Sequence, residues 1–340
     1  MKSLPTKPSV ELVAVATLPT SSLASEESAS SLSSQLSSVT ETRQAPPMGS
    51  MVSTGSTDEP WHHATRPKVK RHQLALWIGA ALVAATVAVA LLSLLWTPAD
   101  PLIANAANRL QGPSNAHLLG TDRLGRDVLS QLMAGARITL LVGFLAVGLA
   151  ALFGIPLGLL AALRGGWLGQ MLGRGFDLLL AFPGLLLAII LAAAFGGGTA
   201  TAAIALGIGG IPAFARVARA GALQVLSSDY VAAARMANRP TWQIAIRHVL
   251  PNILGNLIVQ ASVAFGLAIL AEAGLSYLGL GTAPPTPSWG RMLQDSQAFL
   301  GTHLCLVLAP GLAIALAVLG FNLLGDGLRD RFDPHNQERL

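Results

Sequence analysis

The longest polar and charged interval between two strongly apolar regions is residues 227–252, SSDYVAAARMANRPTWQIAIRHVLPN. Ser227, Ser228 or Asp229 can cap a first helix, because their side-chain oxygens accept hydrogen bonds from free amides of the first turn. Asn238 can end this helix, since asparagine tolerates the left-handed conformation that often closes a helix. The chemistry that such residues offer is the docking of a partner rather than catalysis.

A second short helix is expected after Pro240, which prevents simple continuation of the first helix. Thr241 can cap this second helix, and Pro251 follows its end. A compact pair of helices between apolar segments favours a docking element. An ordinary amphipathic connector would have the same local pattern, so the residues of the interval leave both interpretations open.

Residues for catalysis or metal binding are sparse elsewhere. The four lysines all lie near the N-terminus, at Lys2, Lys7, Lys68 and Lys70. A phosphate-binding loop of the form GxxxxGK[ST] is therefore impossible, and the chain cannot bind ATP by that device. There is no HExxH motif, and the single cysteine, Cys305, permits no intrachain disulfide. We expect no catalytic site, cofactor or metal in this chain.

The composition is that of an integral membrane protein. Only 11% of the 340 residues are charged, whereas a soluble domain has about 25%. Several apolar runs exceed the roughly 18 residues that mark a membrane-spanning helix. The polar residues that membrane enzymes or ion-coupled carriers need are almost lacking inside these runs, which disfavours both classes.

Six membrane-spanning helices are predicted. Their approximate ranges are 74–96, 138–163, 178–195, 200–217, 253–273 and 303–324. The fourth is the weakest by hydropathy. In the second span, Gly154 and Gly158 form a pattern that permits close helix approach, although one glycine pair among many in a glycine-rich chain is the simpler interpretation. We expect a short surface helix near Leu124, capped by Asp122, and a basic inner loop at 164–176.

The distribution of positive charge orients these spans. A basic cluster immediately precedes the first span, which favours a cytoplasmic N-terminus. Six spans then place the C-terminus inside as well. The arginines expected outside are Arg109, Arg123, Arg126, Arg137 and Arg291, which leaves 17 of the 22 basic residues on the cytoplasmic side. This bias accounts for the net charge of +5 without a nucleic-acid partner, and it places residues 227–252 in the cytoplasm.

Glu272 lies near the outer end of the fifth predicted span. A carboxylate inside a membrane is a functional hypothesis by default. At the end of a span it more often faces the interface or pairs locally. A transport role and a local structural role both remain open for this residue.

Five segments together resemble a known family. They are HLLGTDRLGRDVLSQLMAGARITLLVGFLAV from His117, FDLLLAFPGLLLAIILA from Phe176, DYVAAARMANRPTWQIAIRHVLPN from Asp229, ILAEAGLSYLGLGTAPPTPSWGRML from Ile269, and PGLAIALAVLGFNLLGDGLRDRFDP from Pro310. The chain is similar over residues 72–334 to the inner-membrane permease subunits of bacterial ABC importers for peptides and nickel. It resembles most the second, dipeptide-type permease.

The resemblance implies an all-α fold of the type I ABC importer permease, in the bacterial inner membrane. It implies a second homologous permease subunit, two ATP-binding subunits that use ATP and Mg, and a periplasmic substrate-binding protein. The expected organisation is a disordered tail 1–65, a basic flank and first span 66–97, a periplasmic connection 98–136, a permease core 137–328 with a coupling loop 221–251, and a tail 329–340. The expected substrates are dipeptides or oligopeptides, with nickel, glutathione or antimicrobial peptides as alternatives.

The segment from Asp229 is similar to the cytoplasmic coupling motif of the family. The residues that we carry over as ATPase-coupling are Asp229, Tyr230, Ala232, Ala233, Ala234, Arg235, Asn238, Trp242, Arg247 and Pro251. Two of these depart from the motif, because Ala232 stands where the family often has Glu and Asn238 where it has Gly. We expect an apolar face from Tyr230, Met236, Trp242, Ile244, Ile246 and Val249, and cations from Arg235, Arg239 and Arg247. A stand-alone channel or secondary transporter is the alternative of a different class.

Overall fold

The computed structural model describes residues 69–332. Within this range the regular elements are helices, and one isolated bridge joins Thr121 to Asp127. The α-helices are α2 (Val69–Leu95), α3 (Val128–Arg164), α4 (Gly166–Ala181), α5 (Gly184–Phe195), α6 (Thr199–Leu226), α7 (Asp229–Met236), α8 (Thr241–Ile244), α9 (Leu250–Tyr277), α10 (Trp289–Ser296) and α11 (Leu304–Phe332). The predicted tail 1–65 lies outside the described residues.

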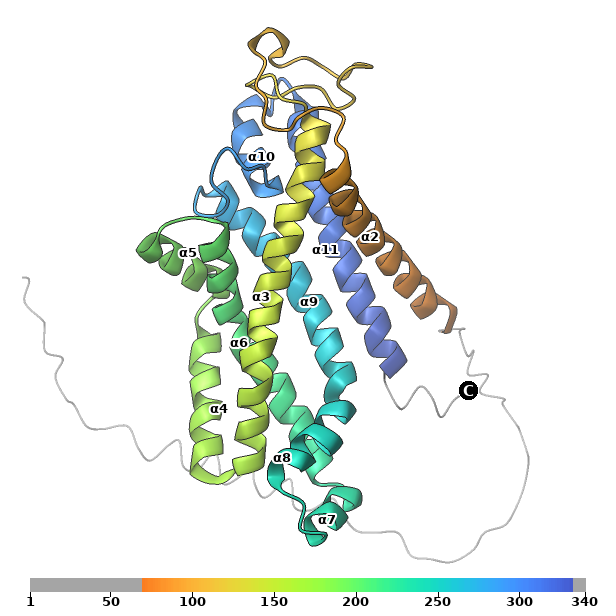
Figure 1. The fold of residues 1–340 in the computed structure, drawn as a ribbon, viewed down its shortest axis with the longest axis vertical. Coiled ribbons are helices and arrows are strands. Elements are labelled where there is room, and N and C mark those ends of the chain that lie inside the picture. The colour runs from red at the N-terminus through yellow and green to blue at the C-terminus, as the bar shows by residue number, and fades with distance from the viewer. Residues whose placement is uncertain (1–68, 333–340) are drawn as a thin grey trace, which may run out of the picture. The chain divides into compact units, whose positions relative to one another are not determined.

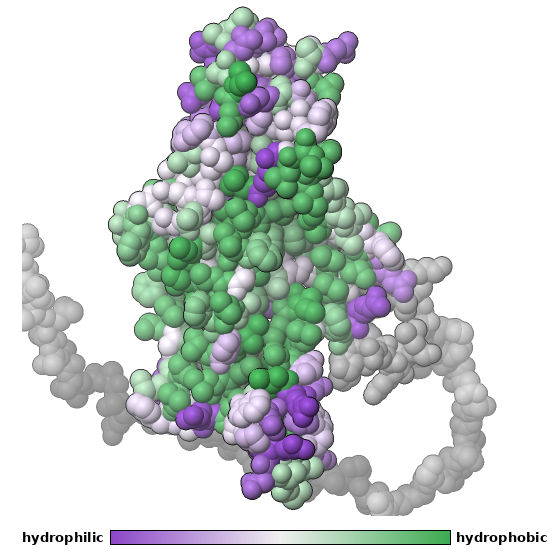
Figure 2. Space-filling view, viewed as in Figure 1, coloured by the Kyte–Doolittle hydropathy of each residue, from purple (hydrophilic) through white to green (hydrophobic). Residues whose placement is uncertain are grey.

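Five helical segments of the described chain are long and apolar enough to cross a membrane, and α4 with α5 forms a sixth if this bent pair is one span. The six-span, all-α prediction is confirmed at this level. The space-filling view shows a broad hydrophobic band with hydrophilic residues gathered at its two ends (Figure 2). Helices α7 and α8 lie at one end of the bundle, and α10 lies at the other (Figure 1).

The most extensive helix–helix packing in the described part of the chain is between α3 and α6. A Cβ added to Gly154 would lie 2.6 Å from the carbonyl oxygen of Ile211, and one added to Gly158 would meet Ala215 and lie 2.9 Å from the Cβ of Ala218. Only residues without a side chain let the two backbones approach this closely. The glycine pair is therefore a packing device, and the simpler interpretation was wrong. As predicted, α6 has the lowest mean hydropathy of the five long segments, at 1.5.

The outer end of α3 differs from the prediction. No separate surface helix begins near Leu124, because α3 starts at Val128 and continues through the membrane to Arg164. Its cap is Asp127, which accepts hydrogen bonds from the backbone amide of Ser130 at 2.8 Å and from its hydroxyl at 2.7 Å. Asp122 instead accepts from the amides of Leu124 and Arg126 and holds the preceding loop in a turn.

The predicted inner loop 164–176 is also wrong. These residues form most of α4, which packs along the inner half of α3 (Figure 1). The helix then breaks at Phe182 and Pro183, and α5 continues at an angle of 82°. Proline has no amide hydrogen and excludes the preceding residue from helical geometry, which explains the break. The C-terminal boundary also moves, since α11 extends to Phe332, beyond the start of the tail predicted at 329.

Candidate functional site

The connection from α6 to α7 is held by hydroxyl groups. Ser227 donates a hydrogen bond to the carbonyl oxygen of Gln224 at 2.8 Å, and Ser228 donates to that of Val225 at 2.6 Å. Both side chains therefore close the last turn of α6 instead of capping α7, contrary to the prediction. Asp229 is the first residue of α7, where its negative charge interacts favourably with the helix dipole.

The end of α7 confirms the conformation predicted for Asn238. Its φ is +58°, in the left-handed region. The amide of Asn238 donates to the carbonyl oxygen of Arg235 at 3.0 Å, and that of Arg239 donates to the carbonyl oxygen of Ala234 at 3.2 Å. This pair of bonds is the Schellman arrangement, in which the left-handed residue satisfies carbonyls that the helix leaves free. Asn238 thus fills the position for which the family favours glycine.

The sequence predicted that the second helix ends before Pro251, and this prediction is wrong. Helix α8, a π-helical turn at Ala245–Val249 and α9 form one helical segment from Thr241 to Tyr277. In the π turn, the amide of Leu250 donates to the carbonyl oxygen of Ala245, five residues earlier. A proline cannot bond to the carbonyl four residues before it and crowds that carbonyl, and the wider turn accommodates this. The predicted cap by the Thr241 side chain is not formed.

Three buried side chains anchor this element to the transmembrane bundle. Val231 and Val249 are fully buried, and Ile244 is only 4% exposed. They share one hydrophobic cluster with the inner parts of α3, α6 and α9. The rings of Tyr230 and His248 lie 6.2 Å apart and connect α7 to the π turn. Ile244 and Val249 had been expected to face a partner, whereas they face the protein's own core. Val231 was missed, although its spacing from the half-buried Ala234 fits one inward helix face.

Seven residues of α7, α8 and the turns beside them are exposed on the side away from this cluster. We call the exposed residues Tyr230, Arg235, Met236, Arg239, Trp242, Ile246 and Arg247 the coupling face. Met236 is 83% exposed and Trp242 is 63% exposed. Within residues 69–332, none of the three arginines makes an ion pair, so their charge is available to a partner. Large apolar side chains interspersed with free cations indicate an interaction surface.

The structure places the ten predicted coupling residues within one continuous segment, from the start of α7 to the start of α9. Nine are exposed: Asp229, Tyr230, Ala232, Ala233, Arg235, Asn238, Trp242, Arg247 and Pro251. Ala234 is half-buried, in contact with the cluster around Val231. Ala232 is exposed, so the glutamate that the family often has at this position would lie on the surface and would not be buried in the protein core.

At the outer end, Glu272 is fully buried and does not face the membrane interface. Its carboxyl group accepts a hydrogen bond from the hydroxyl of Ser276 at 2.7 Å and lies 3.4 Å from that of Thr139 and 3.5 Å from that of Thr282. Ser276 also accepts from the amide of Thr282 at 2.9 Å. These contacts join α9 to α3 and to the loop that follows α9. Of the transport role and the local structural role, these hydrogen bonds support the structural one.

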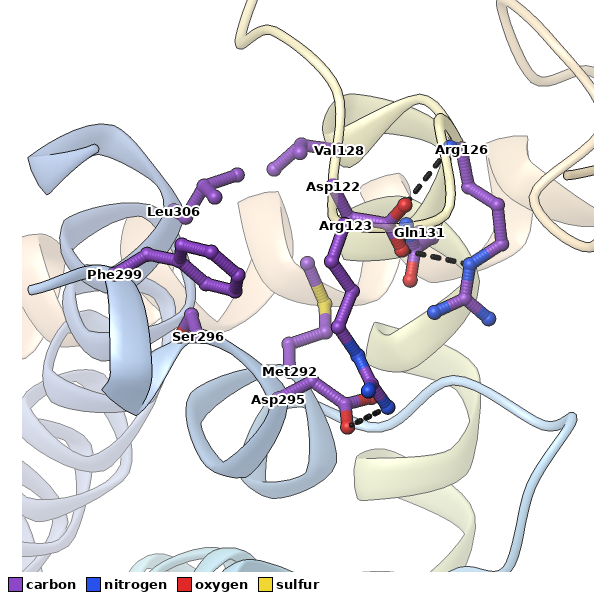
Figure 3. A pocket seen from close by; sticks show the side chains of 10 residues that line it. All are labelled: Asp122, Arg123, Arg126, Val128, Gln131, Met292, Asp295, Ser296, Phe299 and Leu306. Carbon is purple, nitrogen blue, oxygen red and sulfur yellow. Dashed lines mark hydrogen bonds and ion pairs between the residues drawn. The ribbon is translucent and has the colours of Figure 1, made fainter. Parts of the chain in front are cut away.

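The outer end also contains a pocket between the 97–127 connection and α10 (Figure 3). Arg126 and Gln131 donate to the Asp122 carboxylate at 2.7 and 3.0 Å, and Arg123 pairs with Asp295 at 3.0 Å. These charged side chains are thus paired with one another. The pocket wall is a fixed network that ties the connection to α10, rather than a set of free groups.

Comparison with known proteins agrees with this architecture. Residues 154–337 match the family described as "Binding-protein-dependent transport system inner membrane component". The chain is 42% identical to a dipeptide transport system permease of Alkalihalophilus pseudofirmus, over 81% of this chain and 90% of the relative. It is 44% identical to a glutathione transport system permease of Pectobacterium atrosepticum and 45% identical to a di/tripeptide transport system permease of Pseudomonas aeruginosa, each over 66% of this chain and 74% of the relative.

A solved structure titled as inward-facing conformations of the MetNI methionine ABC transporter has the same fold in one of its chains. The TM-score is 0.52 at 18% identity, and the match covers 60% of this chain and 96% of the other. The fold is that of a type I ABC importer permease. The chain belongs to the family of binding-protein-dependent inner-membrane transport components, and it is a multi-pass permease subunit of a bacterial ABC importer.

Proposed function

We propose that the coupling face receives an ATPase subunit and transmits its movement to the membrane helices. The observation that supports this proposal is that the segment from α7 to the π turn has one buried side and one exposed side. One side is fixed to the bundle through Val231, Ile244 and Val249. The other presents free arginines and exposed aromatic residues to the cytoplasm. A force on this surface moves the inner ends of α3, α6 and α9, because Val231, Ile244 and Val249 pack in one cluster with them.

The complete transporter contains a second homologous permease, two ATP-binding subunits and a periplasmic substrate-binding protein. The ATP-binding subunits hydrolyse ATP with Mg, while this chain is not catalytic. The three unpaired arginines of the coupling face suit a partner surface that carries carboxylates. The substrate-binding protein approaches the opposite end of the bundle, where α10 and the connection between α2 and α3 lie (Figure 1).

The substrates are short peptides. The three relatives described above are named for dipeptides, di/tripeptides and glutathione, and glutathione is itself a tripeptide. Nickel or antimicrobial peptides are the alternatives within the same transporter class. Ligand binding by the substrate-binding protein encoded beside this chain identifies the substrate directly, and a nickel-specific binding protein would overturn the peptide assignment.

The coupling role is tested with the double variant Ala233→Gln, Arg235→Glu, which enlarges and recharges the exposed side of α7. We expect ATP hydrolysis by the assembled transporter to continue while peptide uptake falls by at least about tenfold, equivalent to a loss of about 1.4 kcal/mol of coupling. The matched control Ala233→Ser, Arg235→Lys keeps size and charge at both positions and retains uptake. Normal uptake in the first variant would refute the coupling role.

Co-purification separates this proposal from a stand-alone channel or secondary transporter. A tagged chain is expected to recover ATP-binding subunits from membranes, and uptake is expected to stop when ATP is removed. A transporter of the other class would be recovered without an ATPase and would continue to transport without ATP.

A further inference from the structure

Helices α4 and α6 carry an exposed ion pair. The guanidinium of Arg216 lies 2.7 Å from a carboxylate oxygen of Asp177. The side chains are 59% and 68% exposed, so the pair is not covered by the rest of the described chain. Asp177 lies between the predicted loop 164–176 and the predicted span 178–195, and Arg216 lies at the inner end of the predicted span 200–217, so the sequence did not indicate that they form a pair.

The neighbouring contacts place this pair inside the apolar band. A Cβ at Gly169 would lie 2.6 Å from the carbonyl oxygen of Ala161, which sets the level at which α4 packs on α3. Asp177 is eight residues farther along α4, about 12 Å deeper at 1.5 Å per residue. Between residues 138 and 163, α3 carries no charged side chain. The pair therefore lies beside a wholly apolar stretch of α3.

The exposed surface of α4 is divided into two stripes. Gly169, Gly173 and Phe176 are buried against the bundle. Next to them, Gln170, Arg174 and Asp177 follow one another at helical spacing, and all three are exposed. Farther around the helix, the exposed side chains are apolar, including Met171 and Leu178. We call Gln170, Arg174, Asp177 and Arg216 the polar stripe.

The polar stripe requires a polar surrounding. Charged side chains at this depth are costly against lipid and normally face water, a cavity or another protein. The apolar stripe on the same helix suits lipid. One side of α4 therefore faces the bilayer, and the polar stripe faces the region that a second permease subunit encloses.

Positive charge exceeds negative charge around the stripe. Asp177 neutralises Arg216, whereas Arg174 makes no ion pair within residues 69–332. Arg219 adds a further cation, because its guanidinium packs against Gly173 and its Nε is buried without a hydrogen-bond partner in the described chain. A planar guanidinium binds a carboxylate through two parallel hydrogen bonds. A ligand that carries a carboxylate therefore fits the excess positive charge of Arg174 and Arg219.

We propose that the polar stripe lines the water-filled passage between the two permease subunits and binds the terminal carboxylate of a short peptide in transit. This inference rests on the proposed peptide-import function. The exposed position of the arginines keeps the binding weak, as passage requires, since the peptide must also leave.

Thiol labelling of the assembled transporter tests the proposal. Cys305 is the sole cysteine, so Cys305→Ser provides a cysteine-free chain. Gln170→Cys is placed in the stripe, and Met171→Cys, one residue away on the apolar stripe, is the matched control. A membrane-impermeant thiol reagent is expected to modify the first much faster than the second. Recovery of the ATPase subunits and ATP-dependent uptake by the Cys305→Ser transporter are measured first, since their absence would refute the proposed function instead.

The carboxylate specificity is tested on the same Gln170→Cys transporter. Trialanine added at ten times its Kd should slow labelling about tenfold by simple occupancy, while trialanine amide should not. Adding Arg174→Gln should abolish this protection. Absence of labelling at position 170 would mean that the stripe is buried between the two permease subunits, which overturns the proposal. Labelling that trialanine and its amide slow equally, or not at all, would overturn the carboxylate site.

Discussion

Replacing Asn238 by alanine should loosen the end of α7. The φ of +58° places this residue in the left-handed region, which costs residues with a Cβ roughly 1–2 kcal/mol. Asparagine is the residue that tolerates this conformation best after glycine, whereas alanine bears the full cost. We expect Asn238→Ala to destabilise the Schellman turn by about 1 kcal/mol.

Replacement by glycine should have a much smaller effect. Glycine removes the steric cost, but it also loses more backbone entropy on ordering, by roughly 0.5–1 kcal/mol. The two terms nearly cancel, so Asn238→Gly should lie within about 0.5 kcal/mol of the natural sequence. We therefore expect the difference from the family's glycine to leave the stability of this turn nearly unchanged.

Hydrogen exchange at the turn measures this directly. The amides of Asn238 and Arg239 close the end of α7 on the carbonyl oxygens of Arg235 and Ala234. A loss of 1 kcal/mol raises the population of the open state about fivefold, so these two amides should exchange about fivefold faster in Asn238→Ala. Helix α10, at the other end of the bundle, serves as the internal control. Equal exchange in the alanine, glycine and natural proteins would refute the assignment of the left-handed residue as the closing element.

Other substitutions probe the packing and the buried carboxyl group. Gly158→Leu should prevent the close approach of α3 and α6 and cost about 3 kcal/mol or more in thermal unfolding, whereas Gly148→Leu should be tolerated because nothing lies within 4 Å of a Cβ there; equal effects would contradict the packing. Ser276→Ala removes the 2.7 Å hydrogen bond to Glu272 and should cost about 1–3 kcal/mol. The exposed Ser227→Ala should cost clearly less in the same unfolding assay, and a comparable loss would contradict the structural role of the Glu272 contacts.

Hydropathy predicted the membrane spans well where a helix is apolar all round, and failed where polar residues occupy one side. Helix α4 is the clearest case. Its polar stripe contains Gln170, Arg174 and Asp177, and these polar residues led most of the helix to be predicted as a basic loop. The helical spacing of these residues was present in the sequence. The sequence did not indicate that they form one side of a membrane helix. A polar side in the membrane needs a polar neighbour, and only the fold or a partner provides that neighbour.

The docking element was predicted from local signals, which succeeded where one residue decides the conformation. Asn238 is such a residue, since its left-handed conformation follows from the side chain itself. The end of the second helix was predicted wrongly because Pro251 was taken to follow it, and the cap predicted for Thr241 is not formed. A π turn before Pro251 allows the helix to continue, and Val249 in that turn and Ile253 after it pack in the core. Local signals do not contain this packing.

Because of the same π turn, one continuous helical segment extends from the coupling face to the outer end of the bundle. The segment from Thr241 to Tyr277 has 37 residues, which corresponds to about 55 Å at 1.5 Å per residue. Its inner end carries the exposed Trp242, and its outer part carries Glu272, whose hydroxyl partners lie on α3 and on the loop after α9. Had the helix stopped before Pro251, a flexible joint would separate the two. Because it continues, a single helical backbone connects the coupling face to the outer contacts.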